Sequence, residues 1–154
     1  MTDFQPAAIF RALDESNVDY VTVGGMAVIA HGVVRATVDV DLIPNSNREN
    51  LQRLAAALAA LGATPDGEPD TAVAAELLGR DANMRFQSPA GQIDVLLAEQ
   101  YRRLYDDFRR RSVEVEVEGT PIVVVSRNDL IRLKAGTGRD RDLLDVGDLL
   151  ALEE

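Results

Sequence analysis

Residues 37–43 read Thr-Val-Asp-Val-Asp-Leu-Ile, with two acidic residues one position apart among β-branched and apolar ones. A run of this kind is typical of a β-strand, in which successive side chains point to opposite faces. Asp39 and Asp41 are therefore expected to stand together on one face. The opposite face, packed in the core, is expected to consist of Val38, Val40 and Leu42. Because two adjacent carboxylates repel each other, we expect this pair to share a cation or a proton.

The composition is that of a folded domain without disulfides. With 154 residues, 46% of them hydrophobic, the chain is long enough for one packed core, and we expect a single domain over residues 1–154. Cysteine is absent, which excludes disulfide bonds and thiolate metal sites. We find neither a basic-then-apolar leader nor an apolar run near the roughly 18 residues of a membrane span. We therefore expect a soluble, cytoplasmic protein with no membrane partner.

The charge balance restricts the partners. A net charge of −10 argues against a protein that coats DNA, which would be basic, so no DNA partner is expected. A structured RNA could still bind a local basic patch. The sequence offers one such patch, made of Arg102, Arg103, Arg109, Arg110 and Arg111. The alternative is a solvated helix face balanced by Asp106 and Asp107, since most charge runs are solvated.

Hydrophobic periodicity and turn residues predict a mixture of helices and strands. The expected helices cover residues 6–16, 26–30, 48–61, 100–111, 128–134 and 139–152, with a helical turn over 73–78. The expected strands cover residues 20–23, 38–43, 83–87, 92–97, 113–117 and 122–125. Residues 63–72 are expected to form a surface loop. This order predicts an α/β (α+β) fold, a mixed β-sheet flanked by helices, with a helical C-terminus.

A glycine pair, Gly24-Gly25, stands between the strand expected over 20–23 and the short helix that follows. Glycines allow a sharp backbone turn and let a phosphate approach the main-chain amides. Amides at the start of a helix also favour anions. An ordinary strand-to-helix turn is the alternative for such a pair.

A third acid, Asp94, lies in the apolar run over residues 92–97. A lone aspartate in a central strand is costly to bury without a partner. Placed beside Asp39 and Asp41, it would complete a site of hard oxygen ligands suited to Mg²⁺ or Mn²⁺. Such a site can hold two metal ions on the phosphates of a nucleotide, and Asp94 could also accept a proton from an attacking hydroxyl. Solvated acids on an edge strand are the alternative.

The combined pattern resembles the DNA polymerase β-like nucleotidyltransferase superfamily. Its signature is a glycine pair or Gly-Ser, a spacer, an Asp-x-Asp strand and a later third carboxylate. Here these elements fall on Gly24, Gly25, Asp39, Asp41 and Asp94. The superfamily often has serine at the second turn position. With Gly25 there, the resemblance implies that backbone amides take over the phosphate contact of that hydroxyl.

A closer resemblance is to small bacterial nucleotidyltransferases related to AbiEii toxins, over residues 20–43, 92–97 and 130–149. It implies that Lys134, the only lysine, contacts nucleotide phosphate and that Asp142 positions this lysine or a basic partner. Arg35 and Arg139 would hold phosphate or RNA, with structural salt bridges as the alternative. His31, the only histidine, is expected to be packed and hydrogen-bonded.

These resemblances imply a metal-dependent nucleotidyltransferase that moves NMP from an NTP such as ATP to an acceptor hydroxyl. The AbiEii-like motifs favour the 3′ end of tRNA as acceptor and a toxin of a toxin–antitoxin or phage-defence system, with a cognate antitoxin as partner. Alternatives are an antitoxin-type enzyme that AMPylates a tyrosine of a partner toxin, an enzyme that modifies a small molecule, and a nucleotide- or partner-binding module without turnover.

Overall fold

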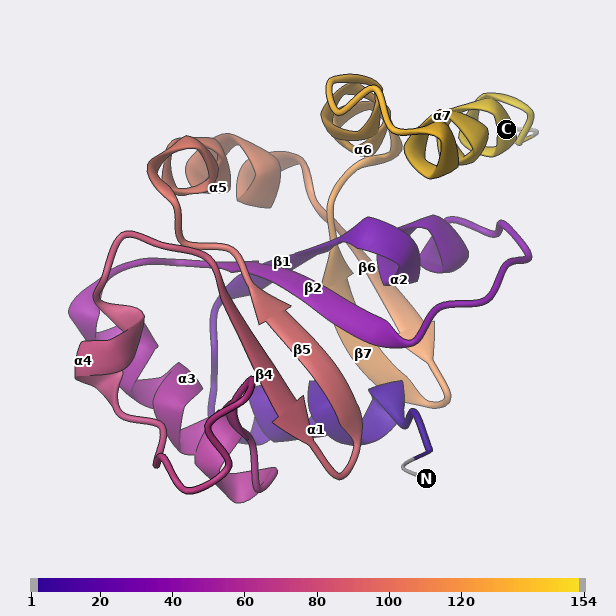
Figure 1. The fold of residues 1–154 in the computed structure, drawn as a ribbon. Coiled ribbons are helices and arrows are strands. Elements are labelled where there is room, and N and C mark those ends of the chain that lie inside the picture. Colours follow the sequence, from indigo (N-terminus) through magenta and orange to yellow (C-terminus); the bar gives the residue numbers. More distant parts are fainter. Residues whose placement is uncertain (1–2, 153–154) are drawn as a thin grey trace.

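A mixed β-sheet forms the centre of the molecule (Figure 1). The computed structural model describes residues 3–152, and these form a seven-stranded sheet in the order β3-β4-β5-β2-β1-β7-β6. The strands are β1 (Tyr20–Val23), β2 (Asp39–Pro44), β3 (Thr64–Pro65), β4 (Met84–Ser88), β5 (Gly91–Val95), β6 (Val113–Val117) and β7 (Thr120–Val124). The strand that carries the acidic pair, β2, is therefore the middle strand, so the edge-strand alternative is excluded.

The pairing around β2 determines which side chains stand next to one another. β2 pairs antiparallel with β1 and parallel with β5, which places Asp41 beside Asp94. β5 in turn pairs antiparallel with β4, which places Arg85 on the other side of Asp94. Because neighbours in register point to the same face of a sheet, these three charged residues form one row across three strands.

Helices cover the sheet on both faces (Figure 1). They are α1 (Pro6–Glu15), α2 (Gly24–Ala30), α3 (Arg48–Ala60), α4 (Ala75–Leu78), α5 (Glu99–Arg111), α6 (Arg127–Ala135) and α7 (Asp140–Leu150). α1 and α3 lie side by side on one face, and α5 contacts β1 and β2. α6 and α7 pack against each other beyond α2.

The core forms on the face of the sheet that α1 and α3 cover. α1 presents Phe10 and Leu13 to it, and α3 presents Leu54 and Leu58, at the three- and four-residue spacings of an amphipathic helix. From the strands come Val40, Leu42, Ile93 and Phe86, all fully buried. Burying these side chains on one face leaves the alternate residues of β2, β5 and β4 on the opposite, polar face.

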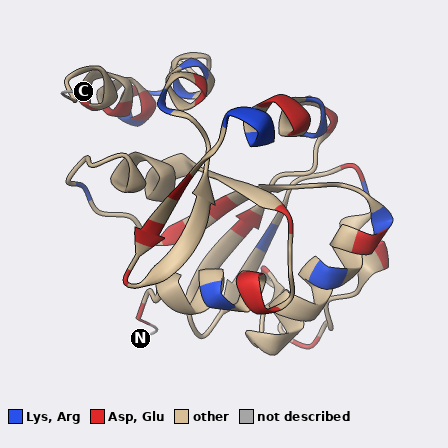
Figure 2. Ribbon diagram, turned by 180° about the vertical axis from the view of Figure 1, so that it is seen from behind, with Lys and Arg blue, Asp and Glu red and all other residues tan. Residues whose placement is uncertain are grey.

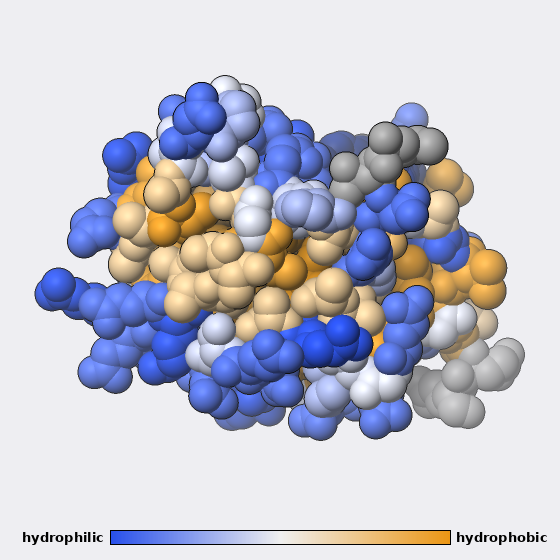
Figure 3. All heavy atoms as spheres, turned by 90° about the horizontal axis from the view of Figure 1, so that it is seen from below, coloured by the Kyte–Doolittle hydropathy of each residue, from blue (hydrophilic) through white to orange (hydrophobic). Residues whose placement is uncertain are grey.

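The outer side of the α1–α3 layer is seen in Figure 3. Mildly apolar residues occupy its centre, with polar residues around them. Exposed alanines of α3 (Ala56, Ala59 and Ala60) account for part of this surface. Among residues 3–152, no helix combines the length and the apolar character needed to cross a bilayer.

The predicted α/β fold is confirmed, and most expected elements lie within two or three residues of their observed bounds. Three details were wrong. Val38 precedes β2 and is 73% exposed, so it does not pack with Val40 and Leu42. The short strand β3 lies inside the expected loop over 63–72, and the two glycines begin α2 instead of preceding it.

Candidate active site

Three carboxylates meet on the polar face of the sheet. Asp39 and Asp41 come from β2 and Asp94 from β5, and one oxygen from each lies within 4.8 Å of the other two. Oxygen ligands of one Mg²⁺ ion, each about 2.1 Å from the metal, are at most about 4.2 Å apart. Only one pair among three ligands of an octahedral ion can be that far apart, and the other pairs are about 3 Å apart, so the carboxylates would move closer together on binding a single ion. The donor set fits a hard divalent cation.

The electrostatics of this cluster centre on Asp41. Burial raises the pKa of its carboxyl group to about 8, and the negative charges of Asp39 and Asp94 add to this shift. The positive charge of Lys134 acts in the opposite direction. In the absence of a cation, the cluster therefore retains a proton at neutral pH, and a bound cation would replace that proton.

The two other carboxylates each receive hydrogen bonds from neighbouring side chains. Arg85 on β4 donates through Nε to Oδ1 of Asp94 at 2.9 Å and through Nη2 to Oδ2 at 3.4 Å. Gln92 donates to Oδ2 of Asp39 at 3.1 Å, and the Thr37 hydroxyl donates to Oδ1 at 3.4 Å. The sequence analysis missed Arg85. The turn between the expected strands could have revealed it, because a two-residue turn over 89–90 brings residue 85 opposite residue 94.

The glycine pair packs directly against this cluster. Gly24 has a φ of +69°, which side-chain-bearing residues rarely adopt, and a Cβ there would overlap the carboxylate of Asp41. A Cβ on Gly25 would lie 2.7 Å from Oγ1 of Thr37. The Thr37 hydroxyl thus takes up space that a serine at position 25 would need. Thr37 belongs to the segment that resembles AbiEii-like proteins, but the sequence alone indicated no role for it.

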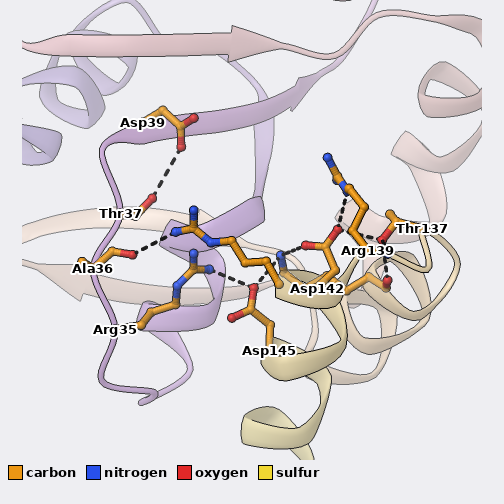
Figure 4. A network of polar contacts seen from close by, with 10 residues as sticks. Arg35, Ala36, Thr37, Asp39, Thr137, Arg139, Asp142 and Asp145 are labelled. Atoms are coloured by element: carbon orange, nitrogen blue, oxygen red, sulfur yellow. Dashed lines mark hydrogen bonds and ion pairs between the residues drawn. The ribbon is translucent and has the colours of Figure 1, made fainter.

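Behind the glycines, the C-terminal helices contribute a buried ion-pair network (Figure 4). Lys134 of α6, which is 7% exposed, places Nζ 3.0 Å from Oδ1 of Asp142 and 3.0 Å from Oδ2 of Asp145, both on α7. Arg35 reaches the same oxygen of Asp145 at 2.9 Å, and Arg139 reaches Oδ2 of Asp142 at 2.9 Å. The predicted pairing of Asp142 with Lys134 is therefore present. Asp145 is a further member, to which the sequence analysis gave no role.

Asp142 is stabilised in its charged form. Burial alone would raise the pKa of its carboxyl group. Hydrogen bonds from Thr137 and Lys134, together with the positive charges of Lys134 and Arg139, lower that pKa below its ordinary value. Asp142 therefore carries its negative charge at neutral pH, and this one aspartate holds both Lys134 and Arg139.

Two cavities adjoin the carboxylates. The first, of about 260 Å³, is lined by both glycines, Asp39, Asp41 and the ion-pair network. Four cationic side chains face it, namely Arg35, Lys134, Arg139 and Arg141. The second cavity, of about 350 Å³, is lined by Asp94, Arg85, Asp66 and Asn83, with Met84 and Leu96. Four aspartates also line the first cavity, so its formal charges balance, and the carboxylate cluster lies where the two cavities meet.

Other candidates from the sequence have structural contacts. His31 places Nε2 2.8 Å from the main-chain oxygen of Val125, as expected for a packed histidine. The arginines of α5 alternate with acids along the helix (Figure 2). Four of them form ion pairs within the chain: Arg102 with Asp81, Arg103 with Glu99, Arg110 with Asp107 and Arg111 with Asp129.

Solved structures with a similar fold are nucleotidyltransferases. The lincosamide antibiotic adenylyltransferase LnuA, solved with lincomycin bound, aligns with a TM-score of 0.70 at 15% identity over 99% of this chain and 100% of its own. ANT(2″)-Ia, in complex with adenylyl-2″-tobramycin, aligns at 0.59 and 18% identity over 92% of this chain and 83% of its own. A nucleotidyltransferase from Thermotoga maritima described as putative aligns at 0.56 and 13% identity over 92% and 88%.

A search of curated protein sequences finds no match. Residues 6–152 match a family described as "nucleotidyltransferase of unknown function (DUF6036)". This match covers nearly the whole chain, and it agrees with the fold comparisons and with the superfamily to which the motifs pointed. The chain therefore belongs to the DUF6036 family of nucleotidyltransferases.

Proposed function

We propose that this protein is a cytoplasmic, metal-dependent enzyme that transfers NMP from an NTP to a hydroxyl group of an acceptor. The observation that carries the proposal is the cluster of Asp39, Asp41 and Asp94, whose oxygens lie within 4.8 Å of one another between two cavities. These carboxylates would hold Mg²⁺ or Mn²⁺, which neutralises phosphate charge and lowers the pKa of an attacking hydroxyl.

The cavity lined by the two glycines and the ion-pair network is the proposed nucleotide site. The side chains of Lys134, Arg35, Arg139 and Arg141 face it, and a triphosphate carries negative charge that matches them. Asp142 and Asp145 hold three of these cations before any nucleotide arrives, so little side-chain entropy is lost on binding. Main-chain amides at Gly24 and Gly25 and the Thr37 hydroxyl complete the phosphate contacts.

The cavity beside Asp94 is the proposed acceptor site. The acceptor oxygen would form a bond to the α-phosphorus while the bond between the α-phosphorus and the bridging oxygen breaks, releasing pyrophosphate. The acceptor proton would pass to Asp94, the only member of the cluster that lines this cavity. The protein contributes mainly positioning and charge, which is typical of phosphoryl-transfer enzymes.

Charge favours a small hydroxylated acceptor. Asp66 and Asp94 line the acceptor cavity, and four of the five arginines in the α5 patch already pair with acids of this chain. Both features disfavour a polyanion such as RNA. LnuA and ANT(2″)-Ia, which share the fold, were solved with lincomycin and with adenylyl-tobramycin, both of them small molecules.

A toxin that modifies the 3′ end of tRNA is the second candidate. It is supported by the Lys134–Asp142 ion pair, which falls in the tail segment that resembles AbiEii-like proteins. AMPylation of a partner protein would use the same nucleotide site. A binding module without turnover is the remaining alternative.

Labelled transfer assays distinguish these functions. The protein would be incubated with each α-³²P-labelled NTP and Mg²⁺, and separately with lincosamides and aminoglycosides, total tRNA, and cell protein. We expect label on a small molecule, release of pyrophosphate, and a loss of at least about 100-fold in Asp41→Asn. Arg103→Ala, which removes an exposed charge on α5, is the matched control and should keep full activity. Tight NTP binding with no transfer to any acceptor would contradict the proposal.

A further inference from the structure

Arg85 holds the third carboxylate from the side opposite to Asp41. In the row across β2, β5 and β4, Asp94 stands between Asp41 and Arg85. The guanidinium group of Arg85 contacts both oxygens of Asp94, at 2.9 and 3.4 Å. Planar two-point contacts of this kind are among the stronger ion pairs in proteins. Among residues 3–152, Arg85 is the cationic residue found in an ion pair with the carboxylate cluster.

The side chain of Arg85 also has space to move away from Asp94. Its side chain is 53% exposed, whereas that of Asp94 is 17% exposed. It lines the cavity of about 350 Å³ beside Asp94, so a change of rotamer would move the guanidinium into open space without disturbing the core. The buried cation Lys134, fixed by two aspartates, has no comparable freedom.

We propose that Arg85 takes the place of a metal cation beside Asp94. Its guanidinium group pairs with the carboxylate of Asp94 when no divalent ion is bound, and this pairing weakens when such an ion binds. This inference rests on the proposed function, because it assumes that the carboxylate cluster binds such an ion. Arg85 is then a positioning residue: its contact with both oxygens holds the carboxylate of Asp94 in place beside the other two carboxylates. Its positive charge opposes the incoming ion, so metal binding requires its contact with Asp94 to weaken.

Coulomb's law gives the direction in which metal affinity should change when Arg85 is replaced by a neutral residue. Removing a positive charge a few ångströms from a divalent ion strengthens binding of that ion. At a half-exposed position screened by water, the gain is about tenfold in affinity. A residue that merely supported the fold would, when removed, leave metal affinity unchanged or weaken it. The sign of the change therefore separates the two roles.

Titration with Mn²⁺ alone, followed by the EPR signal of the free ion, tests this inference. Arg85→Gln is expected to bind Mn²⁺ about tenfold more tightly than the unmodified protein. Arg85→Lys, which keeps the charge, should stay within about twofold. Arg103→Ala removes the same charge from an exposed pair on α5 and should leave Mn²⁺ affinity unchanged.

Thermal unfolding supplies a second readout. Without metal, Arg85→Gln should melt below the unmodified protein, because Asp94 loses its counter-ion. Saturating Mn²⁺ should close this gap, since the ion takes over that role. An Arg85→Gln protein that is folded but binds Mn²⁺ equally or more weakly would overturn the inference and leave the proposed function standing. Unmodified protein that binds no Mn²⁺ would overturn both.

Discussion

Replacing Asp41 with asparagine should stabilise the metal-free protein increasingly as pH rises from about 4 to 8. The pKa of Asp41 rises from 3.8 to about 8 on folding, chiefly because of burial and then because of Asp39 and Asp94. Between these two values the folded chain binds one proton more than the unfolded chain. The free energy of unfolding therefore falls as pH rises through this window, by about 1.4 kcal/mol per pH unit.

For an isolated group, a rise in pH from 3.8 to 8 would lower the free energy of unfolding by about 6 kcal/mol. Because Asp41 shares its environment with two other acids and with water, we expect about half of this, on the order of 3 kcal/mol. The asparagine side chain carries no charge and has nearly the same shape as the protonated acid. The Asp41→Asn variant should thus match the unmodified protein near pH 4 and exceed it by about 3 kcal/mol near pH 8.

Urea unfolding in EDTA at several pH values measures this difference. Adding Mg²⁺ or Mn²⁺ should raise the stability of the unmodified protein at pH 8, because the cation replaces the missing proton beside the carboxylate. The stability of Asp41→Asn, which lacks this carboxylate, should change little. A variant that is less stable than the unmodified protein at every pH would refute the reasoning, since Asp41 would then be a structural residue.

Three further predictions concern the nucleotide cavity. Lys134→Ala should weaken NTP binding in calorimetry and cost about 2–3 kcal/mol of stability, because two buried aspartates lose a shared cation; an unchanged dissociation constant would place Lys134 outside the site. Gly24→Ala should cost at least about 2 kcal/mol in urea unfolding through its positive φ and its overlap with Asp41, and a native-like stability would contradict the contact. Gly25→Ser should destabilise the protein by steric conflict with Thr37, and Thr37→Ala in the same chain should restore stability; additive losses in the double variant would show that the two side chains do not compete.

Local patterns sufficed to predict the parts of the site that depend on periodicity. Alternation along residues 39–42 placed the two acids opposite the buried Val40 and Leu42. The cost of burying a lone acid singled out Asp94. The AbiEii-like resemblance supplied the Lys134–Asp142 pair, which no local pattern would have joined.

The remaining residues depend on how two elements meet, which the periodicity within a single element does not encode. Arg85 meets Asp94 only through the register of the β4–β5 hairpin, and Thr37 meets Gly25 only because the loop before β2 folds back over α2. Val38 was placed in the core because alternation was extended one residue beyond the true start of β2. Such errors arise at the ends of strands, where the alternation of polar and apolar residues continues beyond the last residue that pairs with a neighbouring strand.

The last helix of the described chain has a consequence for any attempt to trim this protein. Two aspartates, Asp142 and Asp145, hold the cations of the ion-pair network beside the proposed nucleotide cavity, and both belong to α7. A fragment that stops before residue 140 would keep the three acids of the carboxylate cluster, but it would lack the aspartates that hold Lys134 and Arg35. The smallest working version of the enzyme must therefore extend through this helix, although the helix supplies no strand and none of the proposed metal ligands.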